Sequence, residues 1–148
     1  MHLVSKIITN KPLDEVWEFF QDPHSLAKWD RSVETVMPTT SGAVRLGYTF
    51  DTIAPTRHGS NKAGLRMHYE ITEFTPSKEV KIALKDSPLF KEAYWQMNFK
   101  TVTEGTLVAC HVVFTPRPLH FYLVPLLWIN KRAILRDLSY LKEALEKS

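Results

Sequence analysis

The sequence predicts an α+β fold, in which a seven-stranded curved antiparallel sheet is combined with two short helices and a long C-terminal helix. Two observations predict it. Between residues 32 and 115, short segments of alternating apolar and polar residues are separated by turn residues, which is typical of antiparallel strands with one buried face. After Pro118 the pattern changes to apolar residues at helical spacing, up to Leu145.

Length and composition favour a single globular domain over residues 1–148. A chain of 148 residues has the usual size of one domain and can bury a sizeable core. Hydrophobic residues make up 44% and charged residues 24%, which excludes a disordered or fibrous chain. One cysteine, Cys110, excludes an internal disulfide. The net charge of +3 lies entirely in residues 117–148 and is too dilute for a nucleic-acid-binding face, so we expect no nucleic-acid partner.

The first strand and a helical insert are expected at the N-terminal end. Leu3–Thr9 alternates as a strand does. Asn10 is the expected N-cap of a helix that follows, and Pro12–Trp29 reads as two helices separated by a kink. The kink falls at Asp22-Pro23, where Asp22 is placed to cap the second helix.

Six further strands and a terminal helix complete the prediction. The expected strands cover residues 33–37, 44–53, 65–71, 80–85, 94–100 and 107–114, and the longest loop is Ala54–Gly64. The final helix is expected from about Tyr122 or Pro125 to Glu146. A helix of that length is over about 30 Å long, so it is buried only if it lies across a strongly curved sheet.

No targeting or membrane-spanning segment is expected. The N-terminal residues alternate as in a strand and lack the basic and then apolar regions of a signal peptide. The longest apolar run, Phe121–Ile129, is interrupted by Pro125 and is far shorter than the roughly 20 residues that cross a bilayer. We therefore expect a cytoplasmic protein.

Four local patterns carry a resemblance to a known family. They are Pro12-x-x-x-Val16-Trp17 after a strand, Asp22-Pro23 followed by Leu26-Ala27-Lys28-Trp29-Asp30, Gly42-x-x-x-x-Gly47 before a strand, and a leucine stripe over 135–146. Together they span nearly the whole chain, which resembles the START-like (SRPBCC) superfamily in its polyketide cyclase/dehydrase and lipid-transport branch. The resemblance implies the helix-grip fold. It implies no single function, because this superfamily includes lipid carriers, hormone receptors, aromatases and cyclases.

A curved sheet that grips one long helix leaves a wedge-shaped gap between the two, where a small apolar ligand can bind. The alternation of the strands predicts which side chains face this gap. Those candidates for ligand binding are Phe50, Met67, Tyr69, Ile82, Trp95, Met97 and Phe99, with Tyr122 and Leu127 from the C-terminal part. Val112 and Phe114 share the same face. A filled core is the alternative, but tryptophan, tyrosine and methionine pack less closely than aliphatic residues, so the set favours a cavity.

Three residues are candidates for catalysis. A buried Tyr69 hydroxyl needs a partner, which is either a ligand or another protein group. Asp30 stands where the short helix meets the second strand, where a turn or cap role is the alternative. His111 has the parity of an outward-facing residue, and only a bulge would turn it inward as a general base.

Other chemistry has no support in the sequence. The six histidines include no pair at metal-ligand spacing, and the five glycines form no phosphate-binding loop. No nucleophile motif is present either. We therefore expect no metal and no cofactor.

The segment Phe121–Trp128 is apolar on every side and is followed by Lys131 and Arg132. It reads as a buried helix start, as a cavity lid, as an edge that makes transient contact with a membrane, or as a partner interface. Together with the loop Ala54–Gly64 it is expected to border the cavity mouth.

The leading prediction is a protein that binds a small hydrophobic ligand, lipid-like or polyketide-like, between the sheet and the C-terminal helix. The first alternative is a polyketide cyclase, aromatase or dehydrase that uses the same cavity. The second is a protein-interaction module that uses the outer face of the sheet. No pattern in the sequence specifies an oligomeric state.

Overall fold

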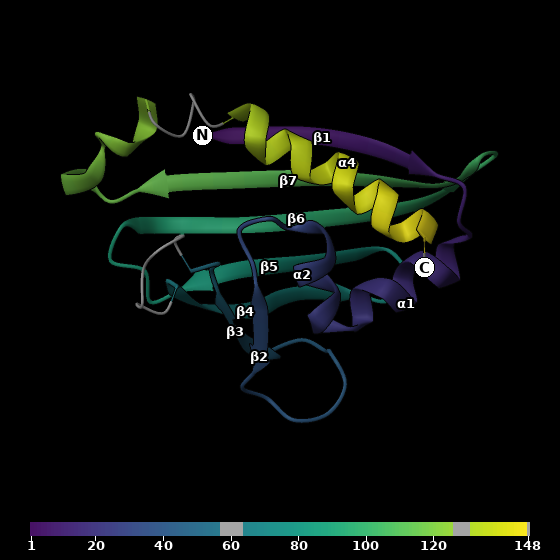
Figure 1. The fold of residues 1–148 in the computed structure, drawn as a ribbon, viewed down its shortest axis with the longest axis horizontal. Coiled ribbons are helices and arrows are strands. Elements are labelled where there is room, and N and C mark those ends of the chain that lie inside the picture. Colours follow the sequence, from purple (N-terminus) through teal and green to yellow (C-terminus); the bar gives the residue numbers. More distant parts are fainter. Residues whose placement is uncertain (57–63, 126–130, 148) are drawn as a thin grey trace.

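The computed structural model describes residues 1–56, 64–125 and 131–147. A single curved sheet of seven antiparallel strands forms its centre, in the order β1-β7-β6-β5-β4-β3-β2 (Figure 1). The strands are β1 (His2–Thr9), β2 (Thr35–Pro38), β3 (Thr49–Ile53), β4 (Arg66–Thr75), β5 (Glu79–Lys85), β6 (Phe90–Val102) and β7 (Gly105–Pro116). The predicted α+β fold with seven antiparallel strands is therefore confirmed.

The helices lie on one face of this sheet (Figure 1). An insert of α1 (Leu13–Gln21), the 3-10 turn η1 (Pro23–Ser25) and α2 (Leu26–Trp29) joins β1 to β2. Since β1 and β2 are the two edges of the sheet, the insert has to pass over the face between them. After β7 come η2 (Pro118–His120) and, at the C-terminal end, α4 (Lys131–Lys147), which packs on β1 and α2.

Of the two helix caps predicted for the insert, the one at Asp22 is confirmed and the one at Asn10 is wrong. The Asp22 side chain accepts a hydrogen bond from the His24 backbone N–H at 3.0 Å and caps η1, as predicted. The prediction for Asn10 was wrong, because the N-cap of α1 is Pro12, which offers no side-chain acceptor. Asp14 and Glu15 lie in the first turn, where the helix dipole favours acidic groups.

Some element boundaries also differ from the prediction. The strand expected from Val44 begins only at Thr49, because Gly47 has φ +83° and turns the chain; its N–H donates to the Ile71 carbonyl. Strand β2 includes Pro38, which an edge strand tolerates. The expected start of the terminal helix adjoins residues 126–130, which lie outside the described residues, and its described part runs from Lys131 to Lys147.

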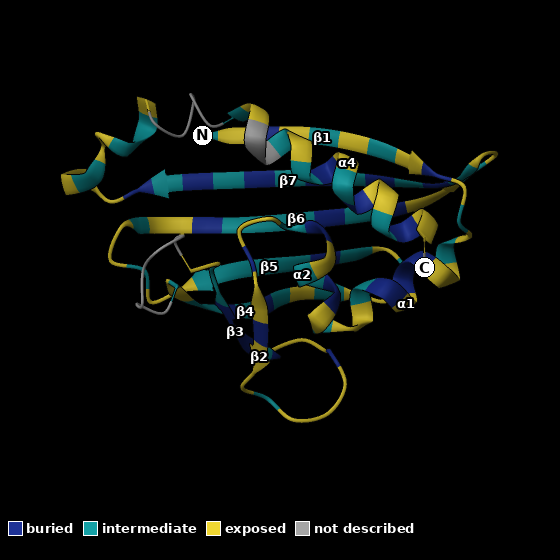
Figure 2. Ribbon diagram, viewed as in Figure 1, coloured by how far each residue is buried: buried dark blue, intermediate teal, exposed yellow. Residues whose placement is uncertain are grey.

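Burial follows the alternation of the strands (Figure 2). Every second residue of β7 from Thr106 to Pro116 is buried, and Tyr69 and Met97 are buried on neighbouring strands as expected. The alternation also predicts that Met67 and Trp95 are buried, but both are half-buried. On the other face it predicts exposed side chains at Arg66, His68, Glu70 and Lys81; Arg66 is exposed, whereas the other three are half-buried. On α4, the stripe Leu138, Leu141 and Leu145 is buried, with exposed fractions of 4%, 0% and 1%. In the described part of the chain no helix has the length and apolar character needed to cross a bilayer.

Candidate functional site

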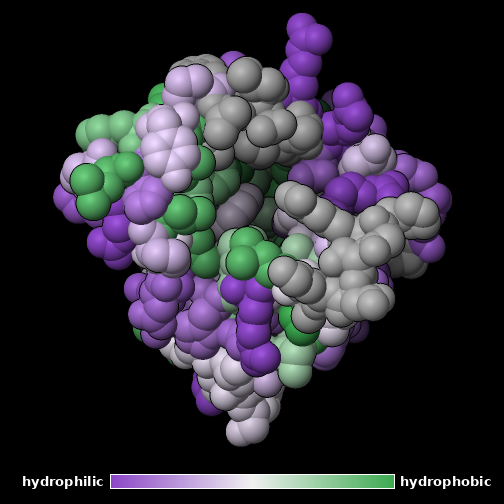
Figure 3. Space-filling view, turned by 60° about the vertical axis from the view of Figure 1, so that its left-hand side comes forward, coloured by the Kyte–Doolittle hydropathy of each residue, from purple (hydrophilic) through white to green (hydrophobic). Residues whose placement is uncertain are grey.

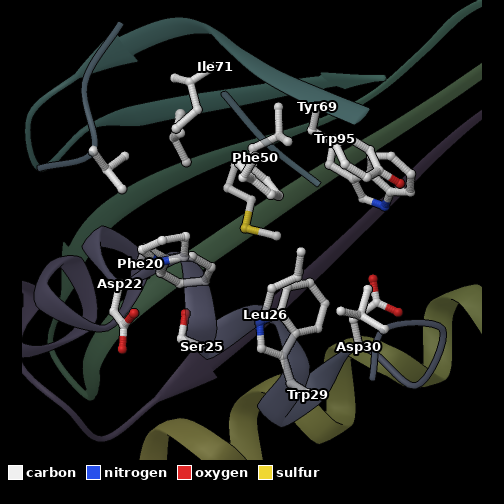
Figure 4. Close-up of a pocket in the computed structure, with 16 residues that line it drawn as sticks. Phe20, Asp22, Ser25, Leu26, Trp29, Asp30, Phe50, Tyr69, Ile71 and Trp95 are labelled. Carbon is white, nitrogen blue, oxygen red and sulfur yellow. The ribbon is translucent and has the colours of Figure 1, made fainter. Parts of the chain in front are cut away.

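A cavity lies between the concave face of the sheet and the helical insert (Figure 4). Strands β3 to β6 supply one wall, and the end of α1, η1 and α2 supply the other. The lining residues are Phe20, Asp22, Pro23, Ser25, Leu26, Trp29, Asp30, Val33, Val44, Phe50, Tyr69, Ile71, Val80, Ile82, Trp95 and Met97. Most of these side chains are apolar, so the cavity suits an apolar ligand.

The size of this cavity limits what enters it without movement. The space between the lining atoms is about 690 Å³, part of it open to solvent. Only about 50 Å³ of it accepts the centre of a water molecule, which is room for a few waters. A drug-sized ligand needs roughly 300–1,000 Å³, so the walls have to move apart to admit one.

Aromatic rings form a row across the floor of the cavity and beyond it. Phe50 on β3 stacks on Tyr69 on β4 with ring centroids 5.5 Å apart. Tyr69 meets the edge of Trp95 on β6 at 5.7 Å, and Trp95 meets Phe114 on β7 at 5.6 Å. The row arises because alternate residues of these strands all point to the concave face, and its flat rings leave gaps that aliphatic side chains would fill.

A second, smaller cavity lies beneath α4. It is lined by Leu3, Ser5, Trp29, Asp30, Trp95, Cys110, Val112, Leu135, Asp137 and Leu138. The expectation of one cavity between the sheet and the C-terminal helix is thereby corrected: among the described residues, α4 lines only the smaller cavity, and the insert covers the larger one. Trp29, Asp30 and Trp95 line both, so the two cavities meet at these residues.

Three polar groups gather near this junction. Asp30 accepts two hydrogen bonds on Oδ1, from the Ser32 backbone N–H at 2.9 Å and the Ser32 hydroxyl at 2.6 Å. Burial and the nearby charge of Asp30 raise the pKa of Asp137 to about 6, although Arg31 and Arg136 act in the opposite direction. Burial, and again the charge of Asp30, also raise the pKa of Tyr69, which keeps that hydroxyl protonated at neutral pH.

The Tyr69 hydroxyl has partners within the protein. It donates to the Met67 sulfur at 3.8 Å and hydrogen-bonds the Thr52 side chain on the adjacent strand. Of the two partners left open by the sequence, a ligand or a protein group, the structure therefore contains the protein group.

The structure brings five of the predicted ligand-binding residues into the larger cavity: Phe50, Tyr69, Ile82, Trp95 and Met97. Three other candidates, Met67, Phe99 and Tyr122, line neither of the two cavities. Met67 lies beyond the Tyr69 hydroxyl, and Phe99 packs against Trp17 and Phe20 of α1. Tyr122 is 62% exposed and contacts the His120 ring. Leu127 lies outside the described residues.

Of the three catalytic candidates, two line the larger cavity and one does not. Asp30 and Tyr69 both line the larger cavity. His111 does not, because β7 pairs in unbroken register around it and no bulge turns it inward. Its ring stacks instead on His2 at 5.5 Å on the opposite face. Burial raises the pKa of Cys110 to about 12, so this thiol is not a reactive nucleophile.

Sequence reasoning missed Asp137, although its spacing carries a signal. Positions 134, 137 and 141 of α4 are three and four residues apart, so Asp137 shares the side of the helix that holds the leucine stripe. A carboxylate on that side indicates either a buried partner or a functional group. The cavity residues of the insert, such as Ser25 and Leu26, carry no comparable signal, because their position depends on how the insert folds back over the sheet.

The outer face of the sheet holds a separate polar cluster. Asp51 accepts hydrogen bonds from Arg66 on Oδ2 at 2.6 Å and from His68 Nδ1 on Oδ1 at 2.5 Å. Burial alone would raise the pKa of Asp51, but these two hydrogen bonds outweigh it and hold that pKa below its usual value. The cluster joins β3 to β4 on the side away from the cavity. Among the described residues, no group of three or more histidine, cysteine or acidic side chains is arranged to hold a metal ion.

One end of the molecule is hollowed, with hydrophobic side chains around the hollow (Figure 3). The described ends of the loop Ala54–Gly64 and the segment that follows β7 both lie at this end (Figure 1). Leu119, Phe121 and Tyr122 are 89%, 60% and 62% exposed there. Residues 57–63 and 126–130 lie outside the described residues, so the prediction that these two segments border the cavity mouth remains a prediction, as does membrane contact through Phe121–Trp128.

The family follows from the sequence as a whole. Residues 2–146 match the family described as polyketide cyclase / dehydrase and lipid transport. The chain belongs to this family. No curated protein sequence matches the chain.

Several solved structures are similar to this chain in fold. The di-domain aromatase/cyclase StfQ of the steffimycin pathway is similar with a TM-score of 0.75 and 13% identity, over 99% of this chain and 49% of that one. TTHA0849 from Thermus thermophilus has a TM-score of 0.73 and 15% identity, over 99% and 95%. Ara h 8.0201 has a TM-score of 0.70 and 9% identity, over 100% and 99%. At these identities the likeness shows the helix-grip fold, as the sequence resemblance implied.

Proposed function

We propose that the protein binds a small, mainly apolar molecule in the cavity between strands β3–β6 and the helical insert. The observation that carries this proposal is the aromatic and aliphatic lining of a recess with few polar groups. In a protein that needed only a packed core, aliphatic side chains would fill such a space. The recess, with polar groups converging on one end, supports this function over an interaction module that uses the outer face.

A neutral fluorescent probe tests the proposal. N-phenyl-1-naphthylamine is nearly dark in water and becomes bright in an apolar site, so its fluorescence should rise and saturate on addition of the protein. Ile82→Phe adds bulk inside the cavity and should weaken binding at least fivefold. Ile8→Phe adds the same bulk on β1, where Ile8 is 43% exposed, and should leave binding unchanged.

Two outcomes of this titration contradict the proposal. One is the absence of saturable binding by the folded protein. The other is equal binding by both isoleucine variants, which would place the probe elsewhere. Since extra bulk in a packed region destabilises by about 1–3 kcal/mol, circular dichroism has to show that Ile82→Phe is folded.

A second function, cyclase or dehydrase activity, has one specific observation in its favour. The cavities bring Tyr69, Asp30 and Asp137 to the same end, and the raised pKa of Asp137 suits proton transfer near neutral pH. In such a reaction a carboxylate would take a proton next to a carbonyl group. The resulting carbanion would attack a second carbonyl carbon, so that a carbon–carbon bond forms, the C=O π bond opens and the alkoxide takes the proton back from the carboxyl group. Loss of this hydroxyl group with a hydrogen of the neighbouring carbon would then release water and leave a carbon–carbon double bond.

The enzymatic alternative is tested with a poly-β-ketone thioester of N-acetylcysteamine as substrate. Activity predicts a product that has lost water and whose formation slows strongly in Asp137→Asn. Glu146→Gln, an exposed acid on the same helix, serves as the control. Equal rates with and without the protein would leave ligand binding as the function.

A further inference from the structure

Every charged residue that lines the two cavities is acidic. These residues are Asp22, Asp30 and Asp137, and the described lining contains no lysine, arginine or histidine. The remaining walls are apolar or aromatic, apart from a few neutral hydroxyl groups and one thiol. A ligand with a carboxylate or phosphate group would therefore enter an apolar space in which all the charges repel it.

The acidic groups occupy a defined place, the junction of the two cavities. Asp30 lines both cavities and Asp137 lines the second. Both hydrogen bonds that Ser32 donates to Asp30 end on Oδ1. In Figure 4, Asp30 lies on the same side of the larger cavity as Tyr69 and Trp95. Carboxylate oxygen atoms and aromatic rings thus converge on one end of an otherwise apolar recess.

The nearest basic residues do not enter this space. Arg31 and Arg136 both influence Asp137, and the Arg31 backbone hydrogen-bonds its carboxylate. Both side chains are exposed, and the Arg31 guanidinium lies over the Tyr140 ring, 4.3 Å from its centroid. They are therefore outside the cavity wall, and burial together with the nearby charge of Asp30 still raises the pKa of Asp137 to about 6.

A positive charge at the junction would relieve this repulsion. It would be attracted to both carboxylates, and it would lie among the aromatic side chains Trp29, Trp95 and Tyr69 of the cavity walls, which attract cations that approach a ring face. We propose that the cavity binds the protonated amine of an otherwise apolar ligand, with the ammonium group at Asp30 and Asp137 and the apolar part against the aromatic row. The inference rests on the proposed function and names its ligand class.

Three naphthalene compounds of similar shape test this inference by displacement of N-phenyl-1-naphthylamine near neutral pH. They are 2-naphthylmethylamine, which is protonated, 2-naphthalenemethanol, which is neutral, and 2-naphthoate, which is anionic. The amine should bind at least about tenfold more tightly than the alcohol, and the carboxylate should bind most weakly; tenfold corresponds to about 1.4 kcal/mol.

Variants assign this preference to the two carboxylates. Asp137→Asn and Asp30→Asn should each reduce the ratio of amine affinity to alcohol affinity at least fivefold, whereas Glu146→Gln should leave this ratio unchanged. Lowering the pH through the pKa of Asp137, about 6, should reduce the advantage in the wild-type protein as that carboxylate takes up a proton.

The outcomes separate this inference from the proposed function. If the probe binds but the amine is no better than the alcohol, or if its advantage survives both asparagine substitutions, the amine-binding inference is wrong and the apolar cavity stands. If the probe itself does not bind, both proposals fail.

Discussion

Asp137 is half-buried on α4 and lines the smaller cavity, whereas the other charged residues of that helix, apart from the half-buried Lys131, are exposed. Burial and the charge of Asp30 raise its pKa in the folded protein to about 6, against roughly 3.9 in an unfolded chain. The folded state therefore binds this proton more tightly than the unfolded state. The resulting stabilisation is complete below about pH 4 and is lost as the pH rises through about 6.

Asp137→Asn should consequently raise the melting temperature near pH 7, because the neutral amide removes a half-buried charge that repels Asp30. Near pH 4 the same substitution should have little effect, since Asp137 is then already protonated. Thermal unfolding followed by circular dichroism at both pH values measures this. Equal effects at the two pH values would contradict the assigned pKa, and Glu146→Gln provides the control for a change in net charge.

Tyr69→Phe is expected to reduce stability. The Tyr69 side chain is 5% exposed, and its hydroxyl is hydrogen-bonded to Thr52. Loss of one such hydrogen bond should lower the free energy of unfolding by about 0.5–1.5 kcal/mol, as measured by urea denaturation. Tyr94→Phe is the matched control on the outer face, where the ring contact with Lys81 is kept. An equal loss in the two variants would argue against a structural role for the Tyr69 hydroxyl.

Gly47 and Gly105, two of the three glycines with positive φ, differ in what surrounds them. Gly47 has φ +83° at the turn before β3, and a Cβ atom there would meet nothing within 4 Å. Gly105 has φ +141° in the β6–β7 hairpin, and a Cβ atom would lie 2.2 Å from the Thr9 carbonyl oxygen. The second position therefore adds a steric clash to the backbone strain.

Gly47→Ala should cost about 1–2 kcal/mol, the usual cost of a left-handed conformation for a residue with a side chain. Gly105→Ala should cost more than that, because β1 has to move away from the hairpin. Free energies of unfolding from urea denaturation compare the two variants directly. If Gly105→Ala is as stable as Gly47→Ala, the backbone at Thr9 and Asn10 moves away from the new Cβ atom at little cost in free energy.

The elements themselves were largely predictable from local pattern, and their exact ends were not. Alternation placed Tyr69, Trp95 and Met97 on one face of the sheet, because a strand sends successive side chains to opposite sides. The late start of β3 depends on a contact between Gly47 and Ile71, residues far apart in the sequence. The prediction that Asn10 caps the first helix failed, because Pro12, two residues later, takes the cap position.

At the scale of the whole molecule, the fold was predictable but the arrangement of the site was predictable only in part. The helices of the insert follow from the spacing around Trp17 and Trp29, yet nothing in that spacing says that they cover the larger cavity. Asp30 and Asp137 line the same cavity because α2 of the insert packs on α4, and a single sequence does not reveal this packing. His111 was assigned outward by parity, and the regular pairing of β7 keeps it there.

Binding of an apolar ligand against the concave face of the sheet, under the insert, can be followed directly by NMR of the methionine methyl groups. Met97 is 1% exposed and lines the cavity, whereas Met37 is 40% exposed on the edge strand β2. On titration with N-phenyl-1-naphthylamine, the Met97 methyl signal, assigned with Met97→Leu, should shift strongly and saturably while the Met37 signal stays in place. A saturating shift of the Met37 signal with an unchanged Met97 signal would show that the ligand binds outside this cavity.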